Sequence, residues 1–208
     1  MSNSVKQWRA IDGWSFDHLV AIGASAGGIE AVPAVLGMLP EDFLSPVVVI
    51  IHFLKNRESR FVELLQAHCA LPVKEADSLE PLEPGTVYVA PRNYHLMLED
   101  DLRFSLDIDE PVSFSRPSVD VFFASAADVL RERLTAVILT GGNGDGAKGI
   151  KKVRQMGGGT IVQDPREARF AAMPEAALQA TDVDFVLPLR EIAPKLVAIS
   201  TKAWQRKI

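Results

Sequence analysis

Short apolar segments typical of buried strands alternate with helical segments along this chain, and this alternation restricts the fold more than any other feature. The apolar segments begin with 19-LVAIGA-24 and 46-PVVVII-51, and helical patterns follow at 27–39 and 58–69. Alternation of this kind is typical of parallel strands joined by crossover helices. The sequence therefore predicts a doubly wound α/β fold, with a mostly parallel sheet and helices on both faces.

The second half of the chain continues this alternation and adds a hairpin. Segments 95–99 and 102–107 are separated by Asp100 and Asp101, so we expect them to pair as an antiparallel hairpin near one edge of the sheet. The other expected elements are a strand at 86–90, a helix at 116–134, a strand at 134–140, a helix at 146–158, strands at 159–163 and 184–189, and a C-terminal helix.

Length and composition restrict the class of protein. The chain has 208 residues, which suits one domain with a buried core, so we expect a leader at 1–18 and a single domain at 19–208. No apolar run is long enough for membrane insertion. The formal net charge of -5 provides no basic footprint for DNA or RNA, so nucleic acid is not an expected partner.

The cysteine and histidine content indicates neither disulfides nor metal. Cys69 is the single cysteine, and residues 1–18 lack the apolar core of a secretory signal, so we expect a cytoplasmic location. The four histidines and the cysteine show no metal-ligand spacing. We therefore propose no metal and no cofactor.

A serine follows the first predicted strand, within the glycine-rich stretch 23-GASAG-27. The stretch fits the G-x-S-x-G pattern, which places a serine hydroxyl at a sharp turn between a strand and a helix. The first N–H groups of that helix, at Ala26, Gly27 or nearby, can stabilise an oxyanion beside Ser25. A serine here can equally cap the helix, and a glycine-rich turn can hold a phosphate, so the motif alone leaves three roles open.

A histidine and an aspartate follow two other predicted strands. If the first two strands are parallel, His52 reaches the same edge of the sheet as Ser25, while His95 at the start of the hairpin is the rival base. Asp145 lies in the glycine-rich loop 140-TGGNGDG-146, where it can orient a histidine as the third member of a triad does. The alternatives are a boundary role for the histidine and a turn or cap role for the aspartate. We expect the serine, the histidine and the aspartate to meet at one edge.

Taken together, several stretches resemble the catalytic domain of the chemotaxis receptor protein-glutamate methylesterase (CheB) family, over the region from about Leu19 to Leu189. The resemblance implies hydrolysis of γ-glutamyl methyl esters on the cytoplasmic helices of methyl-accepting chemoreceptors, with release of methanol, and deamidation of particular receptor glutamines. It implies that Ser25 is the nucleophile, His52 the general base and Asp145 the orienting carboxylate. The matching stretches are 21-AIGASAGGIEAV-32, the strand that ends in His52, 74-KEADSLEPLEPGTVYVAPRNYHL-96, 116-RPSVDVFF-123, 136-AVILTGGNGDGAKG-149 and 173-MPEAA-177.

Five further positions are candidates for the substrate or oxyanion site. The backbone N–H groups of Ala26, Gly27 and Gly142 are expected to face the oxyanion. His95 matches a histidine of the family, and either lines the cleft or has a boundary role. Arg116 matches an Arg-Pro-Ser of the family, and either pairs with the domain's own carboxylates or faces an acidic receptor surface.

The sequence departs from the pattern of the family in several places. Ala26 replaces a threonine after the serine, Ile51 replaces a glutamine before His52, and Gly142 replaces a methionine ahead of an exchanged Gly-Asn pair. Residues 1–18 are too few for the N-terminal phosphorylation-receiver domain of typical members, so we expect a stand-alone catalytic domain. Regulation by a separate protein in trans stays open. Two other functions stay open as well: a receptor-binding module with little or no activity, and a small-phosphate-binding α/β domain.

Overall fold

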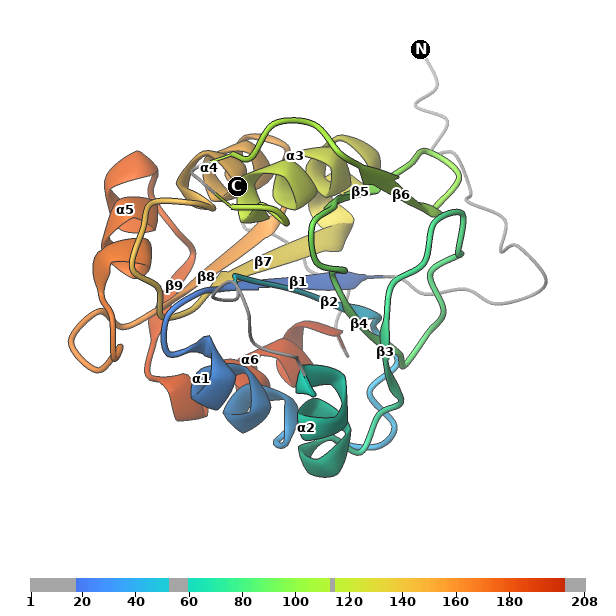
Figure 1. Cartoon of the computed structure of the whole chain (residues 1–208). Helices are drawn as coiled ribbons and strands as arrows, with labels where there is room; N and C mark the ends of the chain where they lie inside the picture. Colours follow the sequence, from blue (N-terminus) through green and yellow to red (C-terminus); the bar gives the residue numbers. More distant parts are fainter. Residues whose placement is uncertain (1–17, 53–59, 113–114, 201–208) are drawn as a thin grey trace, which may run out of the picture.

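A seven-stranded sheet lies between two layers of helices in the computed structural model, which describes residues 18–52, 60–112 and 115–200 (Figure 1). The strand order is β3-β4-β2-β1-β7-β8-β9, and every neighbouring pair is parallel. This architecture confirms the predicted doubly wound α/β fold. The strands are β1 (Leu19–Ala24), β2 (Val47–Ile51), β3 (Val73–Glu75), β4 (Val87–Val89), β7 (Leu134–Ile138), β8 (Gly159–Gln163) and β9 (Phe185–Leu187).

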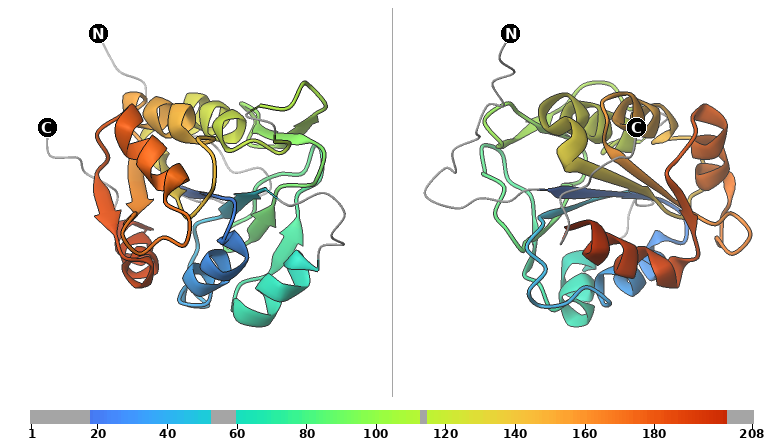
Figure 2. Two further views of the ribbon diagram at one scale, coloured as in Figure 1. Left: turned by 60° about the vertical axis from the view of Figure 1, so that its left-hand side comes forward. Right: turned by 180° about the vertical axis from the view of Figure 1, so that it is seen from behind.

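Three helices cover each face of the sheet (Figure 2). One layer contains α1 (Gly28–Leu36), α2 (Phe61–His68) and α6 (Leu189–Ser200). The other contains α3 (Val119–Leu130), α4 (Ala147–Gln155) and α5 (Ala172–Ala180). Successive residues of the central strands point to opposite layers, and both sets are buried. The central strands therefore consist of continuous apolar runs rather than alternating polar and apolar residues.

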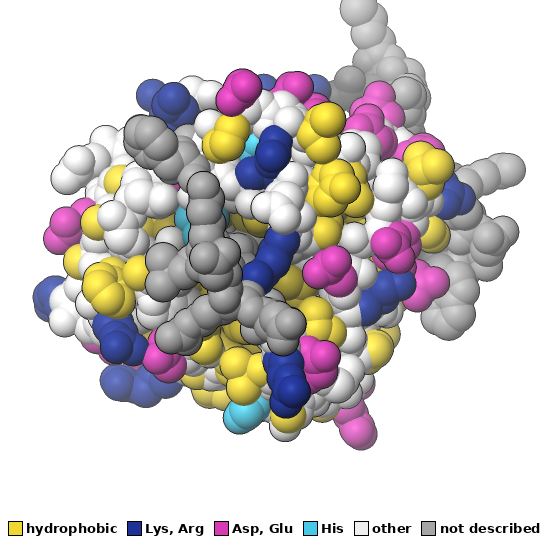
Figure 3. All heavy atoms as spheres, in the orientation of Figure 1, with side chains coloured by type: hydrophobic (Ala, Val, Ile, Leu, Met, Phe, Trp, Pro, Cys, Tyr) yellow, Lys and Arg dark blue, Asp and Glu magenta, His cyan; other side chains and the backbone are white. Residues whose placement is uncertain are grey.

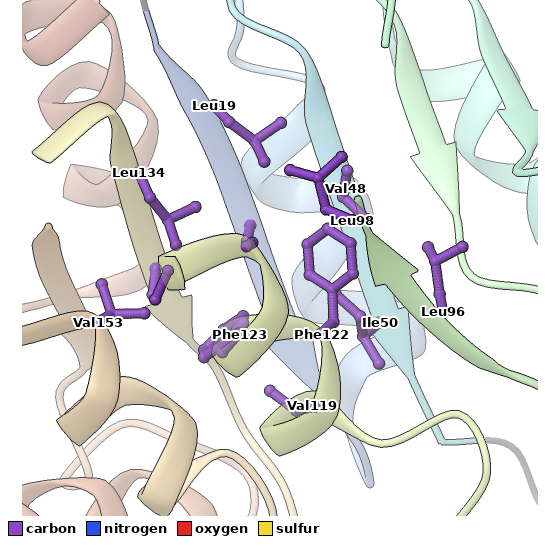
Figure 4. Close-up of a cluster of buried hydrophobic side chains, with 14 of the residues drawn as sticks. Leu19, Val48, Ile50, Leu96, Leu98, Val119, Phe122, Phe123, Leu134 and Val153 are labelled. Atoms are coloured by element: carbon purple, nitrogen blue, oxygen red, sulfur yellow. The ribbon is translucent and has the colours of Figure 1, made fainter. Parts of the chain in front are cut away.

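The predicted hairpin is present as β5 (His95–Leu98) and β6 (Phe104–Asp107), which pair antiparallel. It forms a separate two-stranded sheet instead of extending an edge of the main one. The physical reason is that its apolar face packs on α3: Leu96 and Leu98 join Phe122 in one buried cluster (Figure 4). The two edge strands of the main sheet are β3 and β9, and the sequence pattern did not reveal β3.

Several other elements differ from expectation in detail. The helix expected at 116–134 is α3, which begins after its N-cap Ser118 and ends at Leu130, before the C-cap Arg131 with φ of 53°. A short 3-10 helix (Arg131–Arg133) then leads into β7. The helix α5 was not predicted. Apart from His18, the predicted leader at 1–18 lies outside the described residues.

The order of the strands locates the place where a ligand is expected to bind. From β1 the sheet extends on one side through β2, β4 and β3, and on the other through β7, β8 and β9. Ligands of doubly wound proteins bind at the carboxyl ends of the strands, where the order reverses. In this chain that position is at the ends of β1, β2 and β7.

The surface is mixed in charge. Figure 3 shows Lys and Arg side chains interspersed with Asp and Glu side chains on the face in view, in agreement with the small net charge of -5. Among the described residues, every helix is too short or too polar to cross a bilayer.

Candidate active site

Ser25 lies directly after β1, and its hydroxyl faces the imidazole of His52, with 3.2 Å between Oγ and Nδ1. The tight turn into α1 is made by Gly27, which has φ of 82° and is the N-cap residue. A Cβ at this glycine would lie 2.9 Å from Oγ1 of Thr140, so both the backbone conformation and the space require glycine. Within the described residues α1 begins without a side-chain cap. The Ser25 hydroxyl therefore does not serve as a helix cap.

His52 lies directly after β2, and the register of the sheet places it beside Ser25. Residues Ala24 and Ile51 are partners in the parallel ladder, and the N–H of His52 donates to the carbonyl of Ala24 at 3.2 Å. The opposite side of the ring faces Asp145, with 2.8 Å between Nε2 and Oδ2. Because a carboxylate only accepts, Nε2 carries the proton and Nδ1 is left to accept from the serine hydroxyl.

Asp145 is fully buried and binds the first turn of α3. The two helices next to it use it differently. The N-cap of α4 is Gly146, which has φ of 93°, and α4 has no side-chain cap among the described residues, whereas N–H groups of α3 donate to both carboxylate oxygens. The Asp145 side chain thus holds a helix 25 residues or more away in the chain. Its donors besides His52 are the hydroxyl of Ser118 (2.8 Å) and the N–H groups of Val119 (2.7 Å), Asp120 (3.1 Å) and Gly146 (3.1 Å).

These contacts keep Asp145 ionised. Burial by itself raises the pKa of the Asp145 carboxyl, but the hydrogen bond from His52 and those from the N–H groups of Val119 and Asp120 outweigh it. The net pKa is lowered from its ordinary value. An ionised carboxylate at this place fixes the tautomer of His52 and stabilises the imidazolium when it forms.

The loop after β7 packs against the Ser25 turn. A Cβ at Gly141 would lie 3.0 Å from Cβ of Ser25, and one at Gly142 would lie 3.9 Å from Cβ of Ala26. No described residue accepts a hydrogen bond from the backbone N–H of Ala26, Gly27 or Gly142. The three predicted oxyanion donors therefore lie in adjoining turns with their N–H groups uncommitted within the described part of the chain.

His95 and Arg116 form their hydrogen bonds with a different segment, and none of these bonds involves Ser25, His52 or Asp145. The Nε2 of His95 donates to the carbonyl of Glu110 at 3.2 Å, and the side chain is buried. Nη1 of Arg116 donates to the carbonyls of Ile108 and Asp109, the latter at 2.8 Å. The structure therefore groups these two predicted residues around segment 108–110, where Arg116 binds backbone carbonyls rather than carboxylates among the described residues.

Three residues that sequence reasoning did not select also contribute to the site. Nδ2 of Asn143 lies 3.5 Å from Nδ1 of His52. Thr140 is buried, donates to the carbonyl of Ala26 at 2.9 Å, and accepts from the N–H of Phe170 at 2.9 Å, so it ties the Ser25 turn to the segment before α5. Ser118 donates to Asp145. Their signal in the sequence was only their place in the glycine-rich loop and in the Arg-Pro-Ser stretch.

The described residues contain no group of three or more His, Cys, Asp or Glu side chains arranged to hold a metal ion. The site itself brings together an alcohol, an imidazole and a buried carboxylate in hydrogen-bonded sequence. Fold and site together define an α/β protein with the geometry of a serine hydrolase.

This chain belongs to the CheB methylesterase family, whose sequence model matches residues 20–196. The resemblance stated from the sequence is thereby confirmed. The crystal structure of the Thermotoga maritima CheB methylesterase catalytic domain superposes with a TM-score of 0.84 and 34% sequence identity, covering 89% of this chain and 100% of that one.

Two relatives in other bacteria are named as protein-glutamate methylesterases and protein-glutamine glutaminases. A Geobacillus kaustophilus protein named protein-glutamate methylesterase/protein-glutamine glutaminase is 38% identical over 87% of this chain and 53% of its own length. A Leptospira interrogans protein, which carries the same description in provisional form, is 45% identical over 90% of this chain and 97% of its own length. This chain thus spans nearly all of one relative and about half of the other.

Proposed function

We propose that this chain hydrolyses γ-glutamyl methyl esters on chemoreceptors, releasing methanol, and that the same site deamidates receptor glutamines. The observation that carries the proposal is the position of His52, whose ring lies 3.2 Å from the Ser25 hydroxyl and 2.8 Å from the Asp145 carboxylate. Membership of the CheB methylesterase family and the names of the relatives support the choice of substrate.

The first half of the reaction forms an acyl-enzyme. Oγ of Ser25 attacks the ester carbonyl while Nδ1 of His52 takes its proton. The N–H groups of Ala26, Gly27 and Gly142 are the donors assigned to the oxyanion. As the C–O bond breaks, Nδ1 returns the proton to the methoxy oxygen, and methanol departs.

The second half repeats the same proton transfers with water. A water molecule gives a proton to Nδ1 of His52 and attacks the acyl carbon. As the bond between the acyl carbon and Oγ breaks, Nδ1 returns that proton to Oγ, which restores the Ser25 hydroxyl and releases the glutamyl acid to ionise to its carboxylate. In both halves Asp145 stabilises the imidazolium without itself taking the proton.

The contacts of Ser25 favour this role over the phosphate-binding alternative. Its hydroxyl bonds the imidazole of His52 and, among the described residues, caps no N–H group at the N-terminus of α1, the place where a phosphate would bind. A receptor-binding module of low activity is the remaining alternative, and it rests on the altered loops at Ile51 and Gly142.

We further propose that the protein acts in the cytoplasm on the signalling helices of its receptor, with a separate protein regulating access in trans.

The test is methanol release from methylated receptor membranes by the parent protein and by the Ser25→Ala variant. Removal of the nucleophile should lower turnover by a factor on the order of 10⁴ to 10⁶. Ser78→Ala, at an exposed loop position, is the matched control and should keep the parent rate. Near-parent methanol release by folded Ser25→Ala protein would overturn the proposal, and receptor capture without any methanol release by the parent would favour the binding module.

A further inference from the structure

Asn143 presents a side-chain amide to the nitrogen of His52 that faces the nucleophile. Its Oδ1 accepts a hydrogen bond from the N–H of Asp145 at 3.1 Å. Since an N–H requires an acceptor, this contact sets the amide orientation and turns Nδ2 outward. Nδ2 then lies 3.5 Å from Nδ1 of His52, and Nδ1 lies 3.2 Å from Oγ of Ser25. Nδ2 of Asn143 is therefore a hydrogen-bond donor beside the pair formed by Nδ1 of His52 and Oγ of Ser25.

The leaving group of the substrate must lie next to Nδ1 of His52 and the Asn143 amide. Nε2 of His52 is committed to Asp145, so Nδ1 is the ring nitrogen that takes the Ser25 proton and later gives it away. To receive that proton, the leaving atom of the substrate must approach Nδ1 within hydrogen-bond distance. Asn143 is therefore a neighbour of the leaving atom when the bond to the acyl carbon breaks.

The two substrates of the proposed function differ in what they offer at that position. The methoxy oxygen of an ester bears lone pairs and no hydrogen, so it can take the proton of His52 and also accept from Nδ2 of Asn143 while negative charge develops on it. The nitrogen of a primary amide bears two hydrogens and uses its lone pair for the proton of His52. The hydrogens that it directs at Asn143 are donors, and Nδ2 of Asn143 is a donor as well, so no hydrogen bond forms between them.

We propose that Asn143 is a specificity-determining catalytic residue that donates to the leaving oxygen and so favours methyl esters over primary amides. This inference rests on the proposed function. In both reactions Ser25 Oγ bonds to the acyl carbon; with an ester the C–O bond breaks and methanol carries away the proton of His52, and with an amide the C–N bond breaks and ammonia carries it away. Asn143 adds its hydrogen bond only in the first case.

The test compares leaving groups on one acyl group, using a receptor-derived peptide whose glutamyl side chain is a methyl ester, a p-nitrophenyl ester or a primary amide. The measured quantity is kcat/KM, which reports formation of the acyl-enzyme. Asn143→Ala should lower kcat/KM for the methyl ester by about 10- to 100-fold, the usual effect of losing a donor to developing charge. It should lower kcat/KM for the p-nitrophenyl ester by less than about 3-fold, because that leaving group delocalises its own charge and needs no donor.

Asn143→Asp supplies an independent readout. It keeps an oxygen for the N–H of Asp145 and replaces the donor by an acceptor that can bind the hydrogens of an amide leaving group. The ratio of ammonia to methanol formation should rise by at least about 10-fold. The matched control is Gln179→Glu, the same chemical change at an exposed position of α5, which should leave all three rates unchanged.

Each of these results either supports or overturns the role proposed for Asn143. Equal losses by Asn143→Ala on all three substrates would mean that Asn143 only holds the loop of Asp145, and would overturn the inference. If the Asn143→Asp protein fails to fold, or the parent releases no measurable ammonia, the comparison of the two esters is still decisive. Failure of the proposed function gives a different result, since parent and Ser25→Ala proteins would then be equally slow on the methyl ester.

Discussion

At the scale of single residues, the Asp145 side chain is required to be a carboxylate by its surroundings. Five donors among the described residues converge on it, and both oxygens accept. No side chain other than a carboxylate accepts hydrogen bonds at both ends without offering a hydrogen. The same group thus orients His52 and anchors the first turn of α3.

Replacing Asp145 by asparagine changes one atom and should damage both roles. Whichever way the amide turns, its NH₂ meets N–H groups that cannot rotate away, so the free energy of unfolding should fall by about 2 to 3 kcal/mol. Turnover should fall by a factor on the order of 10⁴, since an amide no longer fixes the imidazole tautomer. Urea denaturation and methanol release measure the two effects.

The control for this change is Asp128→Asn, on the outer side of α3, where the carboxylate pairs with Lys152. That side chain is more than half exposed, so its loss should cost little. An Asp145→Asn protein as stable as the Asp128→Asn protein would contradict the donor network.

At the scale of elements, the site depends on a close approach between β1 and α3. A Cβ at Gly23 would lie 2.4 Å from Cγ1 of Val119, which is too close for two carbon atoms that are not bonded to each other. The N–H of Val119 is one of the donors to Asp145. Glycine at position 23 therefore allows the first turn of α3 to reach the edge of the sheet where the Asp145 carboxylate lies.

Gly23→Ala should push the start of α3 away from the sheet. We expect a loss of about 1 to 3 kcal/mol in unfolding free energy from overpacking, together with lower methanol release because Asp145 loses a partner. The double variant Gly23→Ala/Val119→Ala removes the obstructing Cγ atoms and should recover part of both. If the double variant is worse than the sum of its single variants, the steric explanation is wrong.

At the scale of the whole molecule, a buried histidine links folding to pH. His18 lies against β7, with Nε2 at 2.7 Å from Oγ1 of Thr135, and it is buried. Burial, with a smaller contribution from the charge of Arg133, lowers the pKa of His18 from 6.5 to about 4. The neutral ring is therefore the form that fits the folded state.

The sign of the pH dependence follows from this lowered pKa. Between pH 6.5 and 4 the unfolded chain binds a proton at His18 that the folded protein does not, so stability is complete above pH 6.5 and falls as the pH decreases toward 4. The loss should be on the order of 3 kcal/mol. Urea denaturation across this range should show a shallower decline for His18→Gln than for the parent. The exposed His68→Gln variant serves as control, and an equal decline in all three proteins would contradict the assignment.

Much of this molecule could be predicted from the sequence, because the relevant information is local. Continuous apolar runs such as β1 and β2 are buried on both faces wherever they lie, which is enough to indicate parallel strands covered by helices. Residues that directly follow such strands share an edge of the sheet, so the neighbourhood of Ser25 and His52 could be expected. The short β3 and the helix α5 carry weaker patterns and were not found.

The sequence by itself therefore determined the class of fold, the family, and the three chemical groups at the edge of the sheet. Only the tertiary structure decided that Asp145 binds the first turn of α3 rather than capping α4, that His95 and Arg116 bind segment 108–110, and that Asn143 faces Nδ1 of His52. The physical reason is that periodicity records which face of an element is buried. The partner of a buried polar atom, such as Asp145 93 residues from His52, depends instead on how whole layers are stacked.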